Sequence, residues 1–145
     1  MHGKLPSTFT HNDPHLRNWY IASNGEMGSC DWQTFATGHW SRDMAYTLST
    51  ALMTENRRAW EKDLVRFYID RLQAAGGPRI SFNEAWKYYR QQLFTSLAWW
   101  TLTLTPSSGS SDEAPPDFQP QEATLAFIGR MTTAIDDLDA LSSFD

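Results

Sequence analysis

The pattern of hydrophobic and polar positions changes near residue 31, from short strand-like runs to helical spacing. Residues 19–32, WYIASNGEMGSCDW, hold two such runs on either side of Asn24-Gly25. The pair Asn-Gly tolerates positive φ at both central positions of a tight turn and therefore favours a β-hairpin. We predict strands near residues 18–22 and 27–31, an arrangement that brings Asn18 close to Asp31.

About four helices follow, over residues 41–52, 55–75, from 81 onward, and about 121–138. Apolar residues recur at helical spacing in the last three of them: Trp60, Leu64, Phe67, Tyr68 and Leu72; then Trp86, Tyr89, Leu93, Leu97 and Trp100; then Leu125, Ile128, Ile135 and Leu138. Ser41 and Thr54 are candidate N-caps, Ser81 and Glu84 form a capping-box pattern, and Gly76-Gly77-Pro78 ends the second helix. We expect aromatic residues of the third helix to be mostly core.

The predicted fold is α+β, mainly α, in a single domain over residues 1–145. A polar loop, the hairpin and the first helix occupy residues 8–50, and further helices occupy residues 54–104. Residues 105–120, rich in Pro, Ser and Gly, predict a flexible loop before the last helix, about 121–138. We expect the acidic tail, residues 136–145, to fray.

Composition excludes several classes of protein. Hydrophobic residues make up 41% of 145, the formal net charge is −5, and no basic cluster is long enough to follow a phosphate backbone, so we expect no nucleic-acid partner. The apolar run at residues 93–104 is too short and too rich in threonine to span a bilayer, and the N-terminus lacks a signal peptide. One cysteine, Cys30, rules out an internal disulfide, and we expect it to be buried. These features predict a cytoplasmic protein without membrane contact.

Candidate chemistry is concentrated in HNDPHLRN, residues 11–18, and in CDWQ, residues 30–33. Phosphoryl transfer needs a carboxylate to orient the attacking hydroxyl and accept its proton, together with oxygen ligands that hold Mg2+ on the nucleotide phosphates. Asp13 precedes Asn18 by five residues, and Asp31 lies beyond the predicted hairpin. This order and spacing resemble the kinase arrangement, in which an Asp and an Asn five residues later share one catalytic loop and a second Asp follows a hairpin.

HNDPHLRN resembles the HGDxHxxN loop of aminoglycoside phosphotransferases and their choline-kinase-like relatives. CDWQ resembles the IDWE or IDFE segment of that family, and GHWSRDMAYTL, residues 38–48, resembles its GDPxxDLAxxL stretch. The resemblance covers about residues 8–50. It implies the C-terminal lobe of a protein-kinase-like fold and transfer of the γ-phosphate of ATP or GTP to the hydroxyl of a small-molecule acceptor.

The resemblance also implies roles for individual residues. Asp13 would be the catalytic base, and Asn18 and Asp31 would bind Mg2+. His11 would brace the loop, and Asp43 would cap its helix and tie that helix to the loop.

Several positions depart from the family pattern or lie beside it. Asn12 replaces the usual Gly, and Asn is the non-glycine residue that best tolerates positive φ. Arg17 replaces a common Gly and would contact a phosphate or crowd the loop. We expect His15 at the edge of the cleft, and Gln33, which follows the CDW segment, to shape it.

Only ten residues precede His11, and they contain no glycine-rich phosphate loop and no strand lysine. The resembling enzymes carry these elements in an N-terminal lobe. We therefore expect this chain to correspond to the C-terminal lobe alone, with little or no catalysis by itself. Apolar surface left by the absent lobe would favour association with that lobe or self-association.

Two other functions remain open from the sequence. His11, Asp13 and His15 form H-x-D-x-H, and alternate residues of an extended segment point the same way, so they predict a zinc or manganese site of a metal-dependent hydrolase. The other alternative is a non-catalytic lobe that survives as a nucleotide-binding or regulatory module.

Overall fold

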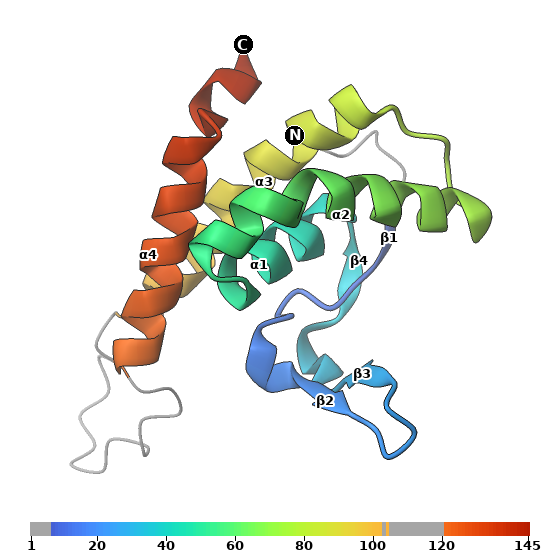
Figure 1. Cartoon of the computed structure of the whole chain (residues 1–145), viewed down its shortest axis with the longest axis horizontal. Helices are drawn as coiled ribbons and strands as arrows, with labels where there is room; N and C mark the ends of the chain where they lie inside the picture. The colour runs from blue at the N-terminus through green and yellow to red at the C-terminus, as the bar shows by residue number, and fades with distance from the viewer. Residues whose placement is uncertain (1–6, 103, 105–120) are drawn as a thin grey trace.

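A computed structural model describes residues 7–102, 104 and 121–145. Four helices form the body of the molecule, and a short β-hairpin lies apart from them at one end (Figure 1). The fold is α+β and mainly α, as the sequence predicts. The expected loop at residues 105–120 lies outside the described residues. No helix in the described part of the chain has both the length and the apolar character needed to cross a membrane.

Two small antiparallel sheets position the polar loop. Strands β2 (Trp19–Ile21) and β3 (Met27–Ser29) form the predicted hairpin, with Trp19 opposite Ser29. Gly25 has φ of +84°, which the tight turn requires and which glycine adopts without strain. Strands β1 (Thr8–Thr10) and β4 (Ala36–Gly38) also pair, a contact that the sequence analysis did not predict. The β1–β4 pair encloses the chain from His11 to Phe35, and the β2–β3 hairpin lies within that stretch. The loop that carries Asp13 is therefore held at one end by β1 and at the other by β2.

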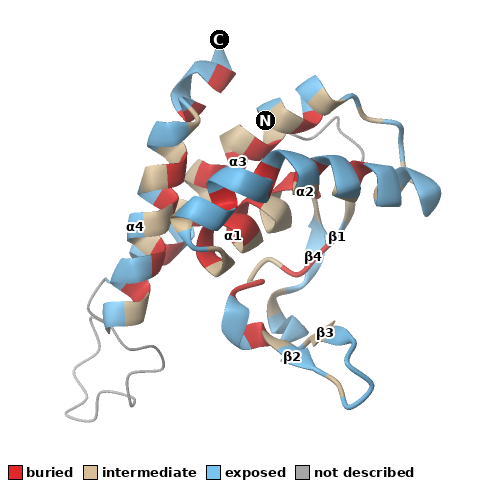
Figure 2. Ribbon diagram, viewed as in Figure 1, coloured by how far each residue is buried: buried red, intermediate tan, exposed pale blue. Residues whose placement is uncertain are grey.

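The four helices are α1 (Ser41–Ala51), α2 (Thr54–Ala74), α3 (Phe82–Leu102) and α4 (Gln121–Asp137), close to the predicted ranges. Helix α3 packs against each of the other three, and buried residues face the interior between them (Figure 2). Tyr89, Leu93 and Trp100 are buried on α3, which confirms its predicted apolar face. The helices therefore form one connected core behind the polar loop.

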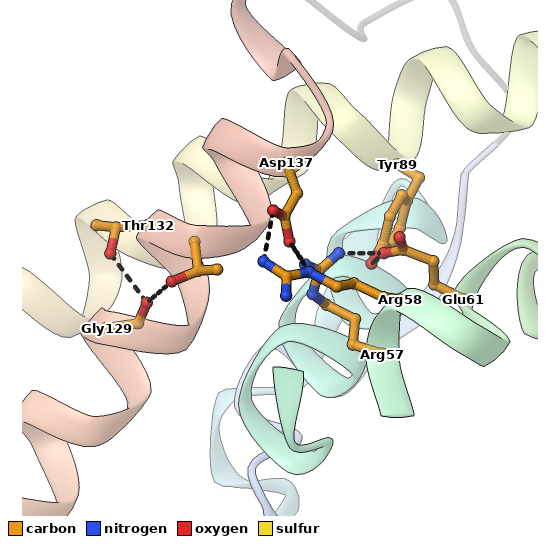
Figure 3. A network of polar contacts seen from close by, with 8 residues as sticks. Arg57, Arg58, Glu61, Tyr89, Gly129, Thr132 and Asp137 are labelled. Atoms are coloured by element: carbon orange, nitrogen blue, oxygen red, sulfur yellow. Dashed lines mark hydrogen bonds and ion pairs between the residues drawn. The ribbon is translucent and has the colours of Figure 1, made fainter. Parts of the chain in front are cut away.

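The buried face of α2 differs from the prediction. Trp60 and Phe67 are exposed, whereas the buried positions are Arg57, Glu61, Val65 and Ile69. Arg57 Nη1 donates to Glu61 Oε2 at 2.7 Å and Nη2 contacts Asp137 of α4, while the Tyr89 hydroxyl donates to Glu61 at 3.2 Å (Figure 3). The paired charges satisfy one another, so Arg57 and Glu61 lie inside the bundle beside the apolar Val65 and Ile69. The predicted residues Leu64, Tyr68 and Leu72 do pack against the core, which confirms that part of the prediction.

The expectation that residues 136–145 fray is wrong. Ala140–Phe144 form a 3-10 helix, η3, that packs on α3, and Ala140 is fully buried. Gln91 Nε2 donates to the Ser143 carbonyl at 2.8 Å, and Arg90 donates to the Ser142 hydroxyl at 2.6 Å. Contacts with α3 thus anchor the acidic tail, and the Phe144 ring packs against Phe94 of the same helix.

The N-cap predictions are also wrong at two helices. Ser41 and Thr54 are the first helical residues of α1 and α2, and the caps, Trp40 and Met53, make no side-chain capping bond. At α3 the Ser81 hydroxyl accepts a hydrogen bond from the Glu84 N–H at 3.3 Å, which is half of the predicted capping box.

Candidate phosphotransfer site

Asp43, in the first turn of α1, holds the polar loop through its backbone. Its two carboxylate oxygens accept hydrogen bonds from the N–H groups of His11, at 2.6 Å, and Asn12, at 3.0 Å. Asn12 has φ of +67°, so both amides turn toward the same carboxylate. Burial raises the pKa of Asp43, and the two backbone hydrogen bonds only partly oppose this. Asp43 therefore ties helix α1 to the loop, as expected, although it does so through the loop amides and not as a helix cap.

Asn12 completes this turn in place of glycine. Its side chain donates to the Thr34 carbonyl at 2.9 Å, and the Thr34 hydroxyl donates to the His11 carbonyl at 2.9 Å. These reciprocal bonds join the polar loop to η2 (Trp32–Thr34), the 3-10 turn that follows Asp31. The left-handed turn is retained with an asparagine, and the asparagine side chain adds a contact that glycine lacks.

The Asp13 carboxylate lies between two donors and is partly exposed, at 21%. The Tyr46 hydroxyl of α1 donates to Asp13 Oδ1 at 2.6 Å, and His15 Nε2 lies 3.5 Å from Oδ2. Burial raises the pKa of Asp13, but the hydrogen bonds from His15 and Tyr46 together outweigh it, so that this pKa lies below its ordinary value. Asp13 is therefore a fixed, ionised carboxylate at neutral pH.

The hairpin brings Asn18 next to Cys30, the residue before Asp31. Asn18 Nδ2 donates to the Asp13 carbonyl at 2.8 Å, and the Cys30 N–H donates to the Asn18 carbonyl at 2.8 Å. Asp31 follows Cys30 directly, is exposed, and has φ of +60°, which turns the chain sharply at that point. Because the Asn18 amide nitrogen is engaged, its oxygen lies on the opposite side of the amide. The structure thus joins Asp13, Asn18 and the residue before Asp31 by two hydrogen bonds.

His11 is a buried brace, as expected. Its Nε2 donates to the Cys30 carbonyl at 2.8 Å, and its ring lies 4.5 Å from that of Trp32. His11 therefore connects the start of the loop to the segment that carries Asp31.

The H-x-D-x-H hypothesis is not supported. His11 is engaged with Cys30, whereas His15 lies against Asp13 and Trp100, because Asn12 interrupts the extended geometry that the hypothesis needs. In the part of the chain that the structure describes, no group of three or more His, Cys, Asp or Glu side chains could hold a metal ion. The alternating pattern therefore does not produce a metal site.

Three other expectations concern the edges of the site. His15 is only 3% exposed and does not lie at the cleft edge, since the Trp100 ring packs against it at 5.7 Å. Cys30 is exposed, not buried, because it lies where the hairpin ends. Arg17, in the polar loop, and Gln33, in η2, are both exposed.

Tyr46 is a residue of the site that the sequence pattern did not predict. It lies three residues after Asp43, and positions three apart share one face of a helix. Because Asp43 was expected to contact the loop, a tyrosine on the same helix face could have been predicted to reach the loop as well. Burial, and then its bond to Asp13, raise the pKa of Tyr46 far above the ordinary value, so this hydroxyl remains a donor.

The Asp13 carboxylate, held by two donors, thus lies beside Asn18, and the exposed Asp31 follows the residue that His11 and Asn18 both contact. The sequence model of the phosphotransferase enzyme family, APH, matches residues 1–82, which is more than half of the chain. The chain belongs to this phosphotransferase family. No curated protein and no solved structure matches it. Family membership supports a kinase-type transferase and leaves the donor and the acceptor to be established.

Proposed function

We propose that the protein, acting together with an N-terminal lobe, transfers the γ-phosphate of a nucleotide, ATP or GTP, to the hydroxyl of a small molecule, with a C-terminal lobe of kinase type as its scaffold. The observation that carries the proposal is the hydrogen-bonded connection from Asp13 through Asn18 to Cys30, the residue before Asp31. This connection supports the proposal because it holds Asp13, Asn18 and the residue before Asp31 in one hydrogen-bonded unit.

Asp13 acts as the base in this proposal. It accepts the proton of the acceptor hydroxyl while the hydroxyl oxygen bonds to the γ-phosphorus. The bond from that phosphorus to the bridging oxygen breaks, and the nucleoside diphosphate leaves. Tyr46 and His15 orient the carboxylate, and positioning is the main contribution that a protein makes to this reaction.

Asn18 and Asp31 would hold Mg2+. Their amide and carboxylate oxygens are hard ligands of the kind that Mg2+ prefers, and Asp31 is exposed where a nucleotide can approach. When bound, the ion would neutralise charge on the nucleotide phosphates. Arg17, exposed on the same loop, would add a second positive charge for those phosphates.

The test is a calorimetric titration of the chain with ATP and with GTP, in the presence and absence of Mg2+. We expect nucleotide binding that requires Mg2+. This binding should weaken at least about tenfold in Asp31→Asn, because the substitution removes the negative charge of one of the two proposed Mg2+ ligands. Asp63→Asn on the exposed face of α2 is the matched control and should bind like wild type.

Asp13→Ala separates the base from the metal ligands. It should retain Mg2+-dependent nucleotide binding and, when an N-terminal lobe is supplied, lose the transfer of phosphate to an acceptor that wild type then shows. Binding that is indifferent to Mg2+, or equal in Asp31→Asn and Asp63→Asn, would contradict the assignment of Asn18 and Asp31. Mg2+-dependent binding with transfer that survives in Asp13→Ala would contradict the assigned base.

A further inference from the structure

A groove of about 510 Å³ lies beside the polar loop, between β4, the start of α1 and one face of α3. Its lining includes Asn12, Thr34, His39, Arg42, Thr95 and Trp99. A larger hollow of about 610 Å³ lies where α2 ends and α3 begins, and none of the polar-loop residues lines it. The groove beside the loop is therefore the one that can serve the site.

Two connections place the groove next to Asp13. Asn12 lines it and directly precedes Asp13. Arg42 lines it too, and it lies one helical turn before Tyr46, whose hydroxyl contacts the Asp13 carboxylate. The groove therefore adjoins the loop that carries the proposed base.

The groove carries a cation without a counterion. Arg42 forms no ion pair with any described residue, and its Nε is buried without a hydrogen-bond partner. Its guanidinium lies 5.9 Å from the centroid of the Trp99 ring. A buried donor without a partner costs free energy, which an acceptor oxygen supplied by a ligand would recover.

Apart from Arg42 and the imidazole of His39, the described lining carries no ionisable side chain. Hydroxyl and amide side chains, those of Thr34, Thr37, Thr95 and Gln92, alternate with the half-exposed ring of Trp99, which is 39% exposed. No aspartate or glutamate is among the described residues that line it. Such a surface matches a hydroxyl-rich ring, whose apolar face packs on an indole while its hydroxyls bond to neutral polar groups.

We propose that this groove binds the acceptor as a hydroxyl-rich ring compound, of sugar or cyclitol type, that is uncharged or anionic. Its ring packs on Trp99, and a hydroxyl or anionic oxygen faces Arg42. An amine-bearing, cationic acceptor is disfavoured, because Arg42 repels it and no carboxylate of the described lining compensates for this. The inference rests on the proposed function and adds the acceptor class to it.

The test compares three probes that differ chiefly in charge: D-glucuronate, D-glucose and D-glucosamine. Each is titrated without nucleotide, in slightly acidic buffer that keeps glucosamine protonated, and the indole N–H signal of Trp99 is followed by NMR. The signal is assigned from its absence in Trp99→Phe. We expect glucuronate to bind about tenfold more tightly than glucose, since a charged hydrogen bond contributes about 1.4 kcal/mol or more, and glucosamine to bind most weakly.

Arg42→Gln should abolish the preference for glucuronate over glucose. The control is Arg66→Gln, which replaces an exposed arginine of α2 and should retain the preference. Trp99→Ala should weaken both sugars, and Trp60→Ala, an exposed tryptophan of α2, should not. Glucosamine binding as tightly as glucose would overturn the proposed acceptor class. No shift of the Trp99 signal with any probe would overturn the assignment of the groove.

Asp31→Asn distinguishes this inference from the proposed function. It should lose Mg2+-nucleotide binding and keep the response to glucuronate, because Asp31 does not line the groove. A normal glucuronate response in a wild-type chain that fails to bind Mg2+-nucleotide would contradict the proposed phosphoryl transfer and leave the groove as a binding site.

Discussion

The hydroxyl of Tyr46 donates a 2.6 Å hydrogen bond to Oδ1 of Asp13, across 33 positions of sequence. Tyr46 is buried in a cluster with Trp100, Phe127 and Met131, so α3 and α4 hold it in place. The orientation of the proposed catalytic carboxylate therefore depends on the helical core and not on its own loop alone.

Tyr46→Phe should raise the pKa of Asp13. The lost hydrogen bond stabilises only the ionised carboxylate, while the burial that opposes ionisation remains. A carbon-13 NMR titration of the Asp13 carboxyl measures this pKa without any need for activity. Tyr88→Phe, which removes a tyrosine hydroxyl from α3 away from Asp13, is the control and should leave the pKa unchanged.

The same substitution should alter the dependence of stability on pH. The folded pKa of Asp13 is depressed, so its contribution to stability is present above the unfolded value of about 3.9 and is lost as pH falls through the folded pKa. Tyr46→Phe should therefore lose less of its stability between neutral and acidic pH than wild type. Urea unfolding at a series of pH values measures this, and identical pH profiles would show that the hydrogen bond does not form.

Asp43→Ala should destabilise the fold by about 3 kcal/mol, because two backbone N–H groups lose a charged acceptor. Amide hydrogen exchange at His11 and Asn12 should accelerate more than exchange in α2. Asp63→Ala, an exposed aspartate, should change stability by less than about 1 kcal/mol. Equal effects of the two substitutions would mean that Asp43 does not hold the loop.

Asn12 allows the turn to be separated from its side-chain contact. Asn12→Gly keeps the positive φ and loses the bond to the Thr34 carbonyl, which should cost about 1 kcal/mol. Asn12→Ala loses the same bond and adds left-handed strain of roughly 1–2 kcal/mol. The expected order of stability in urea unfolding is wild type, then glycine, then alanine. An alanine variant as stable as the glycine variant would contradict the positive φ.

Glu61→Ala should destabilise the protein by about 3–5 kcal/mol, because it removes one partner of the buried Arg57 and the acceptor of the Tyr89 hydroxyl. Glu61→Gln should cost less, since its amide oxygen can still accept from both groups. Guanidinium unfolding compares these variants with Asp63→Ala on the same helix. A loss in Glu61→Ala no larger than in Asp63→Ala would show that the Arg57–Glu61 pair is not part of the buried core.

The sequence by itself determined the elements whose causes are local. Asn24-Gly25 specifies the hairpin turn, and Gly76-Gly77-Pro78 lies just after α2 ends at Ala74, because φ preferences act within a few residues. The order and spacing of Asp13, Asn18 and Asp31 were sufficient to indicate phosphotransferase chemistry, and the family match agrees.

Only the tertiary structure decided which groups meet across distant segments. It placed Tyr46 on Asp13, buried His15, and turned Arg57 and Glu61 inward while Trp60 and Phe67 face out. Helical periodicity counts apolar residues, but a charged side chain is buried when a partner elsewhere compensates its desolvation. That partner, Asp137, lies 80 positions from Arg57. Local preferences fix the helices and the turn, whereas pairing across such separations depends on how the helices pack.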